Sequence, residues 1–218
     1  AFRKMTETSQ TRLLGLRGLF IEARRKGDAG ASRGYAEEAV RLAPAAAWAN
    51  EAVLADRCAA GDFAGARAAL ERAERLRVLD KATGARQRAV LLTAEALTRE
   101  EPTDSQIARD LALEAHRLAP GLVPAAVVAG RLSAERGELR KAARIIETAW
   151  KEEPHPDLAE VYLHLRQGDS ALDRLMRAKS LQRLRPENAE SALALARAAV
   201  DAREFLKARE VLAPLVAA

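Results

Sequence analysis

The chain has 218 residues, of which 49% are hydrophobic and 31% are charged, and its formal net charge is +5. This balance excludes a disordered chain, and no apolar run approaches the roughly 20 residues of a membrane span. Aromatic residues make up only 4%, and alanine, leucine, arginine and glutamate dominate, so the composition predicts helices and disfavours a sheet. The single cysteine, Cys58, excludes an internal disulfide and is expected to be a small buried residue of a helix.

The positive charge is concentrated near the N-terminus. Residues 1–44 contain nine Lys/Arg and five Asp/Glu, whereas residues 45–218 contain 27 and 26. A basic surface of this kind suits acidic lipid, nucleic acid or an acidic protein, and the alternative is an ordinary solvated helix surface. The basic residues do not alternate with aromatic residues, which argues against nucleic acid.

Glycine and proline recur with a period of 34 residues. The spacing from Gly27 to Gly61 and the spacing from Pro120 to Pro154 are both 34. A fixed period of this length is that of the tetratricopeptide helix-turn-helix unit. We therefore predict an all-α, right-handed α-solenoid of about six helical hairpins, forming one repeat domain over residues 1–218. The predicted units are 13–46, 47–80, 89–122, 123–156, 157–188 and 189–218, and residues 1–12 are predicted to end a preceding helix.

The first two units depart from the repeat pattern at single positions. In unit 13–46, Phe20 and Ser32 occupy positions where small residues are expected. In unit 47–80, Val78 replaces the closing proline. In unit 123–156, Gly137 is expected to supply the positive φ of a helix C-cap.

The third unit is displaced along the chain. Pro44 and Pro120 are 76 residues apart, which is eight more than two periods. We place the extra residues around 80–88, as a longer linker or as an extended start of the next helix. Thr103 followed by Gln106 predicts a capping box that opens a helix over 106–118.

The fourth unit matches the repeat pattern best, and the fifth is short. Gly130 stands where a small residue lets the facing helix approach, and Gly137 takes the turn. Pro154 and Pro186 are only 32 residues apart. In this fifth unit, Asp157 is expected to cap the first helix together with Glu160.

Both ends of the sequence carry apolar residues that suit further stacking. Phe2 and Met5 share one helix face near the start, and Val211, Leu212 and Leu215 lie near the end. Solenoids normally end in polar capping repeats. We therefore expect this sequence to be a piece of a longer array.

No catalytic constellation is found, and no catalytic or metal-binding residue is predicted. The phosphate-binding and nucleophile-elbow motifs are absent from the sequence. His116 is expected to be exposed near a helix end, His155 to lie in a turn, and His164 to lie near Tyr162 on a first helix. The simplest interpretation is a set of unliganded histidines. The alternative is haem ligation by His155 or His164, with Tyr162 as an oxygen ligand.

Binding is expected on the concave face, which the first helix of each hairpin lines. The residues at the repeat positions that face this surface are Arg17, Arg24, Trp48, Glu51, Arg131 and Arg197, together with Arg25 and Glu100. Arginine and tryptophan often anchor protein interfaces. Each of them alone is equally compatible with packing or with a solvated surface. As a set, they predict a groove that binds a protein partner.

Several segments resemble the HemY family of proteobacterial proteins, and the resemblance covers most of the chain. The segments that carry it are 14–20 (LGLRGLF), 80–81 (DK), 88–94 (RAVLLTA), 114–120 (EAHRLAP), 141–144 (KAAR), 154–159 (PHPDLA), 168–170 (GDS) and 194–197 (ALAR), together with Trp150. These motifs are moderately specific, because tetratricopeptide arrays share much of their sequence.

The resemblance implies a protein held in the bacterial inner membrane by an N-terminal hydrophobic hairpin, which this sequence lacks, with a cytoplasmic repeat domain. It implies an association with late haem biosynthesis, as a scaffold for its enzymes or as a haem-handling protein. Three hypotheses follow: a non-catalytic protein-binding scaffold that needs no cofactor, a haem- or porphyrin-binding module, and an enzyme. The third requires a convergent polar pocket that the sequence does not predict.

Overall fold

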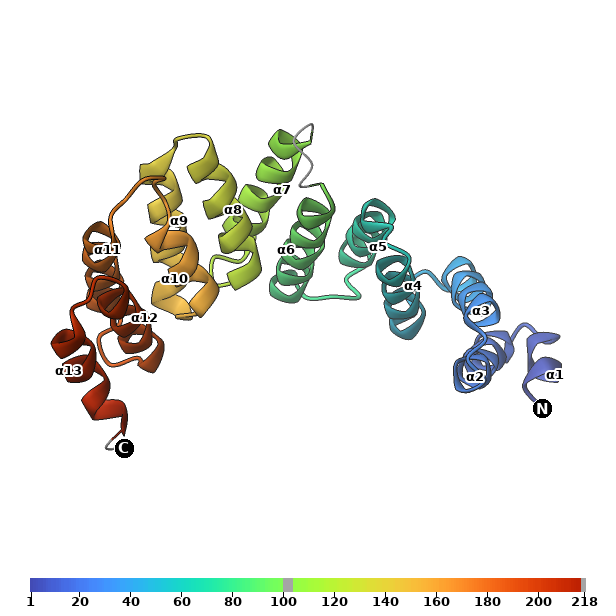
Figure 1. Cartoon of the computed structure of the whole chain (residues 1–218). Helices are drawn as coiled ribbons and strands as arrows, with labels where there is room; N and C mark the ends of the chain where they lie inside the picture. Colours follow the sequence, from blue (N-terminus) through green and yellow to red (C-terminus); the bar gives the residue numbers. More distant parts are fainter. Residues whose placement is uncertain (100–103, 217–218) are drawn as a thin grey trace. The chain divides into compact units, whose positions relative to one another are not determined.

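The computed structural model describes residues 1–99 and 104–216, and in this part of the chain it contains thirteen α-helices and no strand (Figure 1). The helices form consecutive antiparallel hairpins of the tetratricopeptide type, so the predicted all-α fold is confirmed. They group into two compact units, Ala1–Leu91 and Leu92–Ala218. The prediction of a single domain over 1–218, with the repeat boundaries given above, stays a prediction.

The first unit contains five complete helices and the beginning of a sixth. These are α1 (Phe2–Thr6), α2 (Arg12–Arg25), α3 (Ala29–Leu42), α4 (Ala47–Ala59), α5 (Phe63–Arg75) and α6 (Lys81–Thr98), which continues into the second unit. Its interior is built from small and medium aliphatic side chains. One cluster contains Leu16, Ala36, Ala39, Val40, Ala49, Val53 and Ala69, and another contains Ala66, Leu70 and Leu91.

The second unit contains the end of α6 and seven further helices. These are α7 (Ser105–Leu118), α8 (Val123–Glu135), α9 (Leu139–Glu152), α10 (Pro156–Leu163), α11 (Ala171–Leu184), α12 (Ala189–Asp201) and α13 (Phe205–Val216). Its larger cluster is centred on Trp150 and Ile146 of α9, both fully buried. A smaller cluster joins α11, α12 and α13 through residues such as Leu175, Leu195 and Ala208.

The hairpin turns follow from the Gly-Asp pairs found in the sequence. Gly27 and Gly61 have φ values of 73° and 70°, in the region that favours glycine. The aspartate after each glycine caps the next helix: the Asp28 carboxylate accepts from the Ala31 N–H, and the Asp62 carboxylate accepts from the Gly65 N–H. In these two hairpins, the glycine and the aspartate therefore determine where the second helix begins.

The eight extra residues near 80–88 lengthen the start of α6, which reaches 18 residues. The Asp80 side chain opens the helix, because its Oδ1 accepts from the backbone N–H groups of Ala82 (3.0 Å) and Thr83 (2.9 Å). Of the two alternatives for these residues, an extended helix start is confirmed.

The helix caps differ in part from the predictions. Thr103 of the predicted capping box lies outside the described residues, and α7 begins at Ser105. Asp157 does not cap α10 as predicted: it lies in the first turn, and its N–H donates to His155 Nδ1 at 3.2 Å. The proline at N1 moves the N-cap position to His155. A capping box between Ser170 and Asp173 opens α11 and was not predicted.

Gly130 allows close contact between α8 and its neighbours, as expected. A Cβ atom at this position would lie 2.7 Å from Ile146 Cδ1 on α9 and 3.5 Å from Val161 Cγ1 on α10. Both the helix around Gly130 and the Ile146 side chain are buried. A long side chain at position 130 has no space without displacing α9 or α10.

We predict that Gly130→Leu lowers the free energy of unfolding by about 1–3 kcal/mol, because overpacking displaces Ile146. Gly130→Ala should change it much less, since the methyl contact is offset by a gain of roughly 1 kcal/mol in helix propensity. Urea denaturation followed by circular dichroism measures both. A Leu variant as stable as the parent contradicts this assignment of the α8–α9 contact.

Arg203 occupies the turn position that glycine takes in other hairpins. Its φ is 62°, compared with 73°, 70°, 78° and 83° at Gly27, Gly61, Gly137 and Gly168. It follows the C-cap residue of α12, and its N–H donates to Val200 O at 2.9 Å. A side chain in this left-handed conformation is strained relative to glycine.

We predict that Arg203→Gly raises the free energy of unfolding by about 0.5–1 kcal/mol, because it relieves this strain. The matched control is Arg209→Gly within α13, which should lower it by roughly 1 kcal/mol through lost helix propensity. Thermal melting distinguishes the two signs. A loss of stability in both variants would show that the φ of residue 203 carries no strain.

Candidate functional site

Two open cavities lie between consecutive first helices of the hairpins. In the first unit, α4 and α6 enclose a volume of about 780 Å³, here called the α4–α6 groove. It is lined by Glu51, Leu54, Ala55, Cys58, Ala82, Thr83, Arg86, Gln87, Val90 and Leu91. In the second unit, a cavity of about 520 Å³ lies mainly between α8 and α10, here called the α8–α10 cavity. Both occur on the helices that the sequence predicted to form the binding surface.

The α4–α6 groove has apolar walls and a polar rim. Leu54 and Leu91 form its inner part, and Val90 is 48% exposed at its surface. Glu51 from α4 and Arg86 from α6 are exposed and supply one charge of each sign. This arrangement suits an apolar anchor flanked by polar or charged groups.

Cys58 is only half-buried and contributes to the wall of the α4–α6 groove, which corrects the prediction of a buried residue. It is less covered than expected because the groove opens beside it. Partial burial raises the pKa of its thiol above the ordinary value. The side chain is therefore a neutral, weakly polar part of the wall and not an activated nucleophile.

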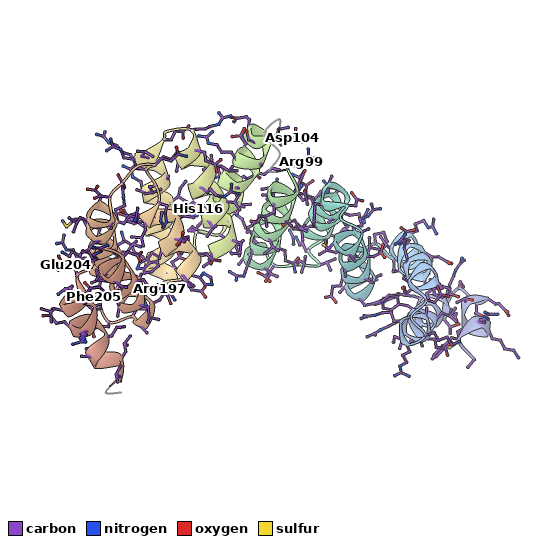
Figure 2. All side chains as sticks on the ribbon, viewed as in Figure 1. Arg99, Asp104, His116, Arg197, Glu204 and Phe205 are labelled. Carbon is purple, nitrogen blue, oxygen red and sulfur yellow. The ribbon has the colours of Figure 1, made fainter. Side chains whose placement is uncertain are left out.

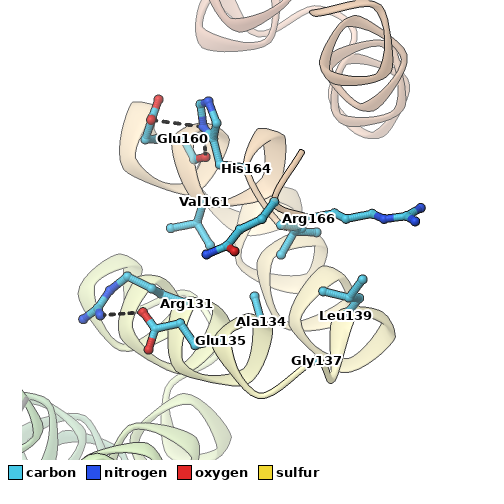
Figure 3. Close-up of a pocket in the computed structure, with 11 residues that line it drawn as sticks. Arg131, Ala134, Glu135, Gly137, Leu139, Glu160, Val161, His164 and Arg166 are labelled. Atoms are coloured by element: carbon cyan, nitrogen blue, oxygen red, sulfur yellow. Dashed lines mark hydrogen bonds and ion pairs between the residues drawn. The ribbon is translucent and has the colours of Figure 1, made fainter. Parts of the chain in front are cut away.

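The α8–α10 cavity is more polar, and two of its polar contacts are between side chains of its own wall (Figure 3). Arg131 Nη1 lies 3.1 Å from the Glu135 carboxylate on α8. His164 Nδ1 lies 3.1 Å from the Glu160 carboxylate and 2.9 Å from the Glu160 carbonyl oxygen. Val161 and neighbouring aliphatic residues form the apolar part of the wall.

An aromatic and cationic cluster connects α2 with α4. The rings of Phe20 and Trp48 have centroids 5.4 Å apart, and the Arg24 guanidinium lies 5.7 Å from the centre of the Phe20 ring. Phe20 is the residue that stands where the repeat pattern expects a small one. Here it joins two predicted binding residues, Arg24 and Trp48, into one surface feature.

The structure places the predicted binding residues in different surroundings. Glu51 lines the α4–α6 groove, and Arg131 lines the α8–α10 cavity. Arg24 and Trp48 belong to the cluster around Phe20. Arg17 on α2 is exposed and lines neither cavity. Arg197 on α12 is also exposed and lines neither cavity (Figure 2).

Sequence reasoning missed the wall of the α4–α6 groove that α6 contributes. Ala82, Thr83, Arg86 and Gln87 precede the third predicted unit, within the eight-residue excess. Because these residues lie outside the 34-residue repeats, the repeat pattern assigns none of them to the binding surface. The signal that would have found them is the excess itself, because added turns at the start of a first helix must extend its surface.

The candidate haem ligands occupy three separate settings. His155 is the N-cap residue of α10, and His164 is exposed at the rim of the α8–α10 cavity. Tyr162 is buried, and its hydroxyl donates to the Glu147 carboxylate at 2.6 Å. Burial and this carboxylate raise the pKa of Tyr162, so its phenol stays protonated at neutral pH.

His116 is half-buried on α7, which corrects the prediction of an exposed residue (Figure 2). The residue lies beside α9, together with which it lines one cavity. Burial lowers the pKa of the imidazole, although Glu152 opposes the shift. The described residues contain no group of three or more His, Cys, Asp or Glu able to hold a metal ion. None of the helices they form has the length and apolar character of a membrane span.

No protein-family model and no curated protein matches the sequence. Similar solved structures include YrrB, a TPR protein with an unusual peptide-binding site (TM-score 0.48, 14% identity, 89% of this chain and 97% of that chain). A tetratricopeptide repeat protein from Parabacteroides merdae has a TM-score of 0.48 and 12% sequence identity, and the match covers 99% of this chain and 79% of that chain. A thermophilic TPR protein from Thermus thermophilus has a TM-score of 0.37 and 20% sequence identity, and the match covers 86% of this chain and 99% of that chain. The fold assignment of the present chain rests on its own helical hairpins.

Proposed function

We propose that this chain is a non-catalytic scaffold that binds segments of partner proteins on the first helices of its hairpins. The observation that carries the proposal is the α4–α6 groove, a wide cavity with apolar walls between two consecutive first helices. An apolar side chain of a partner entering it would release water from Leu54, Val90 and Leu91. Glu51 and Arg86 at the rim would select the flanking residues by charge.

The cluster of Arg24, Phe20 and Trp48 supports the same proposal. Phe20 and Trp48 are partly buried against the core of the first unit, so their rings are held in place and few side chains would have to be ordered on binding. It lies on α2 and α4, so it belongs to the same succession of first helices as the groove. Arg17 extends the positive charge along α2 and favours an acidic flank in the partner.

The test is to select peptides from a random displayed library on the purified chain and to measure the affinity of the best binders by fluorescence anisotropy. Val90→Glu places a charge in the apolar groove and should weaken binding at least tenfold, since a carboxylate there opposes an apolar anchor. The matched control is Leu97→Glu, because Leu97 is 51% exposed on the same helix but does not line the groove.

The control variant should bind within about twofold of the parent, a difference of roughly 0.4 kcal/mol in binding free energy. Equal weakening by both variants would mean that the groove has no particular role. A selection that yields no binder would contradict the proposed function itself.

The resemblance to the HemY family supports a finer proposal about partners and location. We propose that the partners include enzymes of late haem biosynthesis and that the repeats serve the cytoplasmic side of the inner membrane. Purified haem-biosynthesis enzymes, added as competitors to the fluorescence anisotropy assay, should displace the selected peptides if they use the same groove.

A second candidate function is haem or porphyrin binding at the α8–α10 cavity. Its supporting observation is His164, an exposed imidazole at a cavity that also contains Val161 and Leu165. Nδ1 already contacts the Glu160 carbonyl oxygen, so Nε2 is the nitrogen available to an iron. A bound haem would supply an iron for the His164 imidazole to ligate, and Arg131 or Arg166 would pair with its propionates.

We predict that, if this second function holds, titration with haem produces a Soret band that His164→Ala abolishes. His155→Ala is the matched control and should leave the band unchanged, because His155 caps α10 and lies outside the cavity. Absorption spectroscopy at neutral pH measures both. A band that survives His164→Ala, or no band at all, would contradict haem binding at this cavity.

A further inference from the structure

A third open cavity lies on the second helices of the hairpins and has a different chemistry. It is a groove of about 390 Å³ between α7 and α9, here called the basic groove. Its lining consists of His116, Arg140, Lys141, Arg144, Ile145 and Thr148. Three of these residues carry a positive charge and none is acidic. The groove shares no lining residue with the α4–α6 groove or the α8–α10 cavity.

Arg140 and Arg144 are one helical turn apart on α9 and both are exposed. Like charges at this spacing repel each other. Within the described part of the chain, neither guanidinium makes a hydrogen bond or an ion pair. A negatively charged group of a ligand, bound beside Arg140 and Arg144, would therefore offset the repulsion between them.

Lys141 has a partner, but that partner is shared. Its ammonium lies 3.4 Å from the Glu138 carboxylate. The same carboxylate accepts two hydrogen bonds from the guanidinium of Arg109, which is largely buried. Glu138 therefore divides its charge between Lys141 and Arg109, and Asp110, 3.8 Å from Arg109 Nη1, is a second and more distant partner of that guanidinium. The lining of the basic groove itself contains three cations and no carboxylate.

The dimensions of the basic groove indicate an extended ligand. Arg140 and Thr148 are eight residues apart on α9, which corresponds to about 12 Å along the helix. An extended peptide covers this distance with about four residues. Ile145 is buried beneath the cations and offers an apolar floor to the methylene groups of acidic side chains.

We propose that the basic groove binds an acidic segment of a partner protein, about four residues long and containing at least two Asp or Glu. The cations are spread along a groove, which suits carboxylates in a row better than one compact anion. They also line a concave space, whereas a lipid surface is contacted best by a flat or protruding patch. This second site is independent of the proposed function of the first helices.

The test uses a fluorescein-labelled hexaglutamate peptide and measures its binding by anisotropy at low and physiological salt. Arg140→Gln/Arg144→Gln should weaken binding at least tenfold and reduce its salt dependence, because two charge contacts are lost. The matched control is Arg183→Gln/Arg209→Gln, which removes two charges from exposed positions on other second helices, α11 and α13. This control should bind within twofold of the parent.

The imidazole of His116 provides a readout at the groove itself. Its ring resonances should shift on titration with hexaglutamate in the parent and in the control variant, but not in Arg140→Gln/Arg144→Gln. Hexaglutamine should produce no shift. Equal loss of affinity in both double variants, or a His116 signal that does not respond, would overturn the proposal. Binding to phosphatidylserine vesicles through Arg140 and Arg144 without binding to hexaglutamate would also overturn it.

Discussion

Close contact between helices through small side chains is the constraint on which the structure depends. Alanine occupies fully buried contact positions throughout both units, for example Ala39 on α3, Ala66 on α5 and Ala149 on α9. At Gly130 even a methyl group would press on Ile146. Helices that meet through such residues leave little space between them, so a regular hairpin fills its own interior. A large cavity between first helices is therefore expected beside a departure from regular stacking.

The two larger cavities lie beside the two departures from the 34-residue period. The α4–α6 groove borders α6, which the eight extra residues lengthen to 18 residues. The α8–α10 cavity borders α10, which has only eight residues and belongs to the 32-residue unit. A first helix that is longer or shorter than its neighbour cannot match it along its whole length. Both mismatches occur on the surface that the repeat geometry assigns to binding.

The sequence predicted the fold because the repeat signals are local. The Gly-Asp pairs position the second helices through a backbone conformation and a cap, and both act within a few residues. The same locality explains what was missed. His116 lies beside α9, and the exposure of Cys58 depends on the start of α6. Neither neighbour is visible in the periodicity of the helix that carries the residue. The spacing of prolines located the irregular repeats but contained no information on the cavities beside them.

The sites differ in the physical term that governs binding. In the α4–α6 groove, release of water from Leu54, Val90 and Leu91 would dominate, so its contribution would appear mainly in the dissociation rate. In the basic groove, Arg140, Lys141 and Arg144 act over longer distances, so they would contribute mainly to the association rate and its salt dependence. The two sites can therefore be told apart by kinetics, because added salt slows association at the basic groove and leaves an apolar contact in the α4–α6 groove largely unchanged.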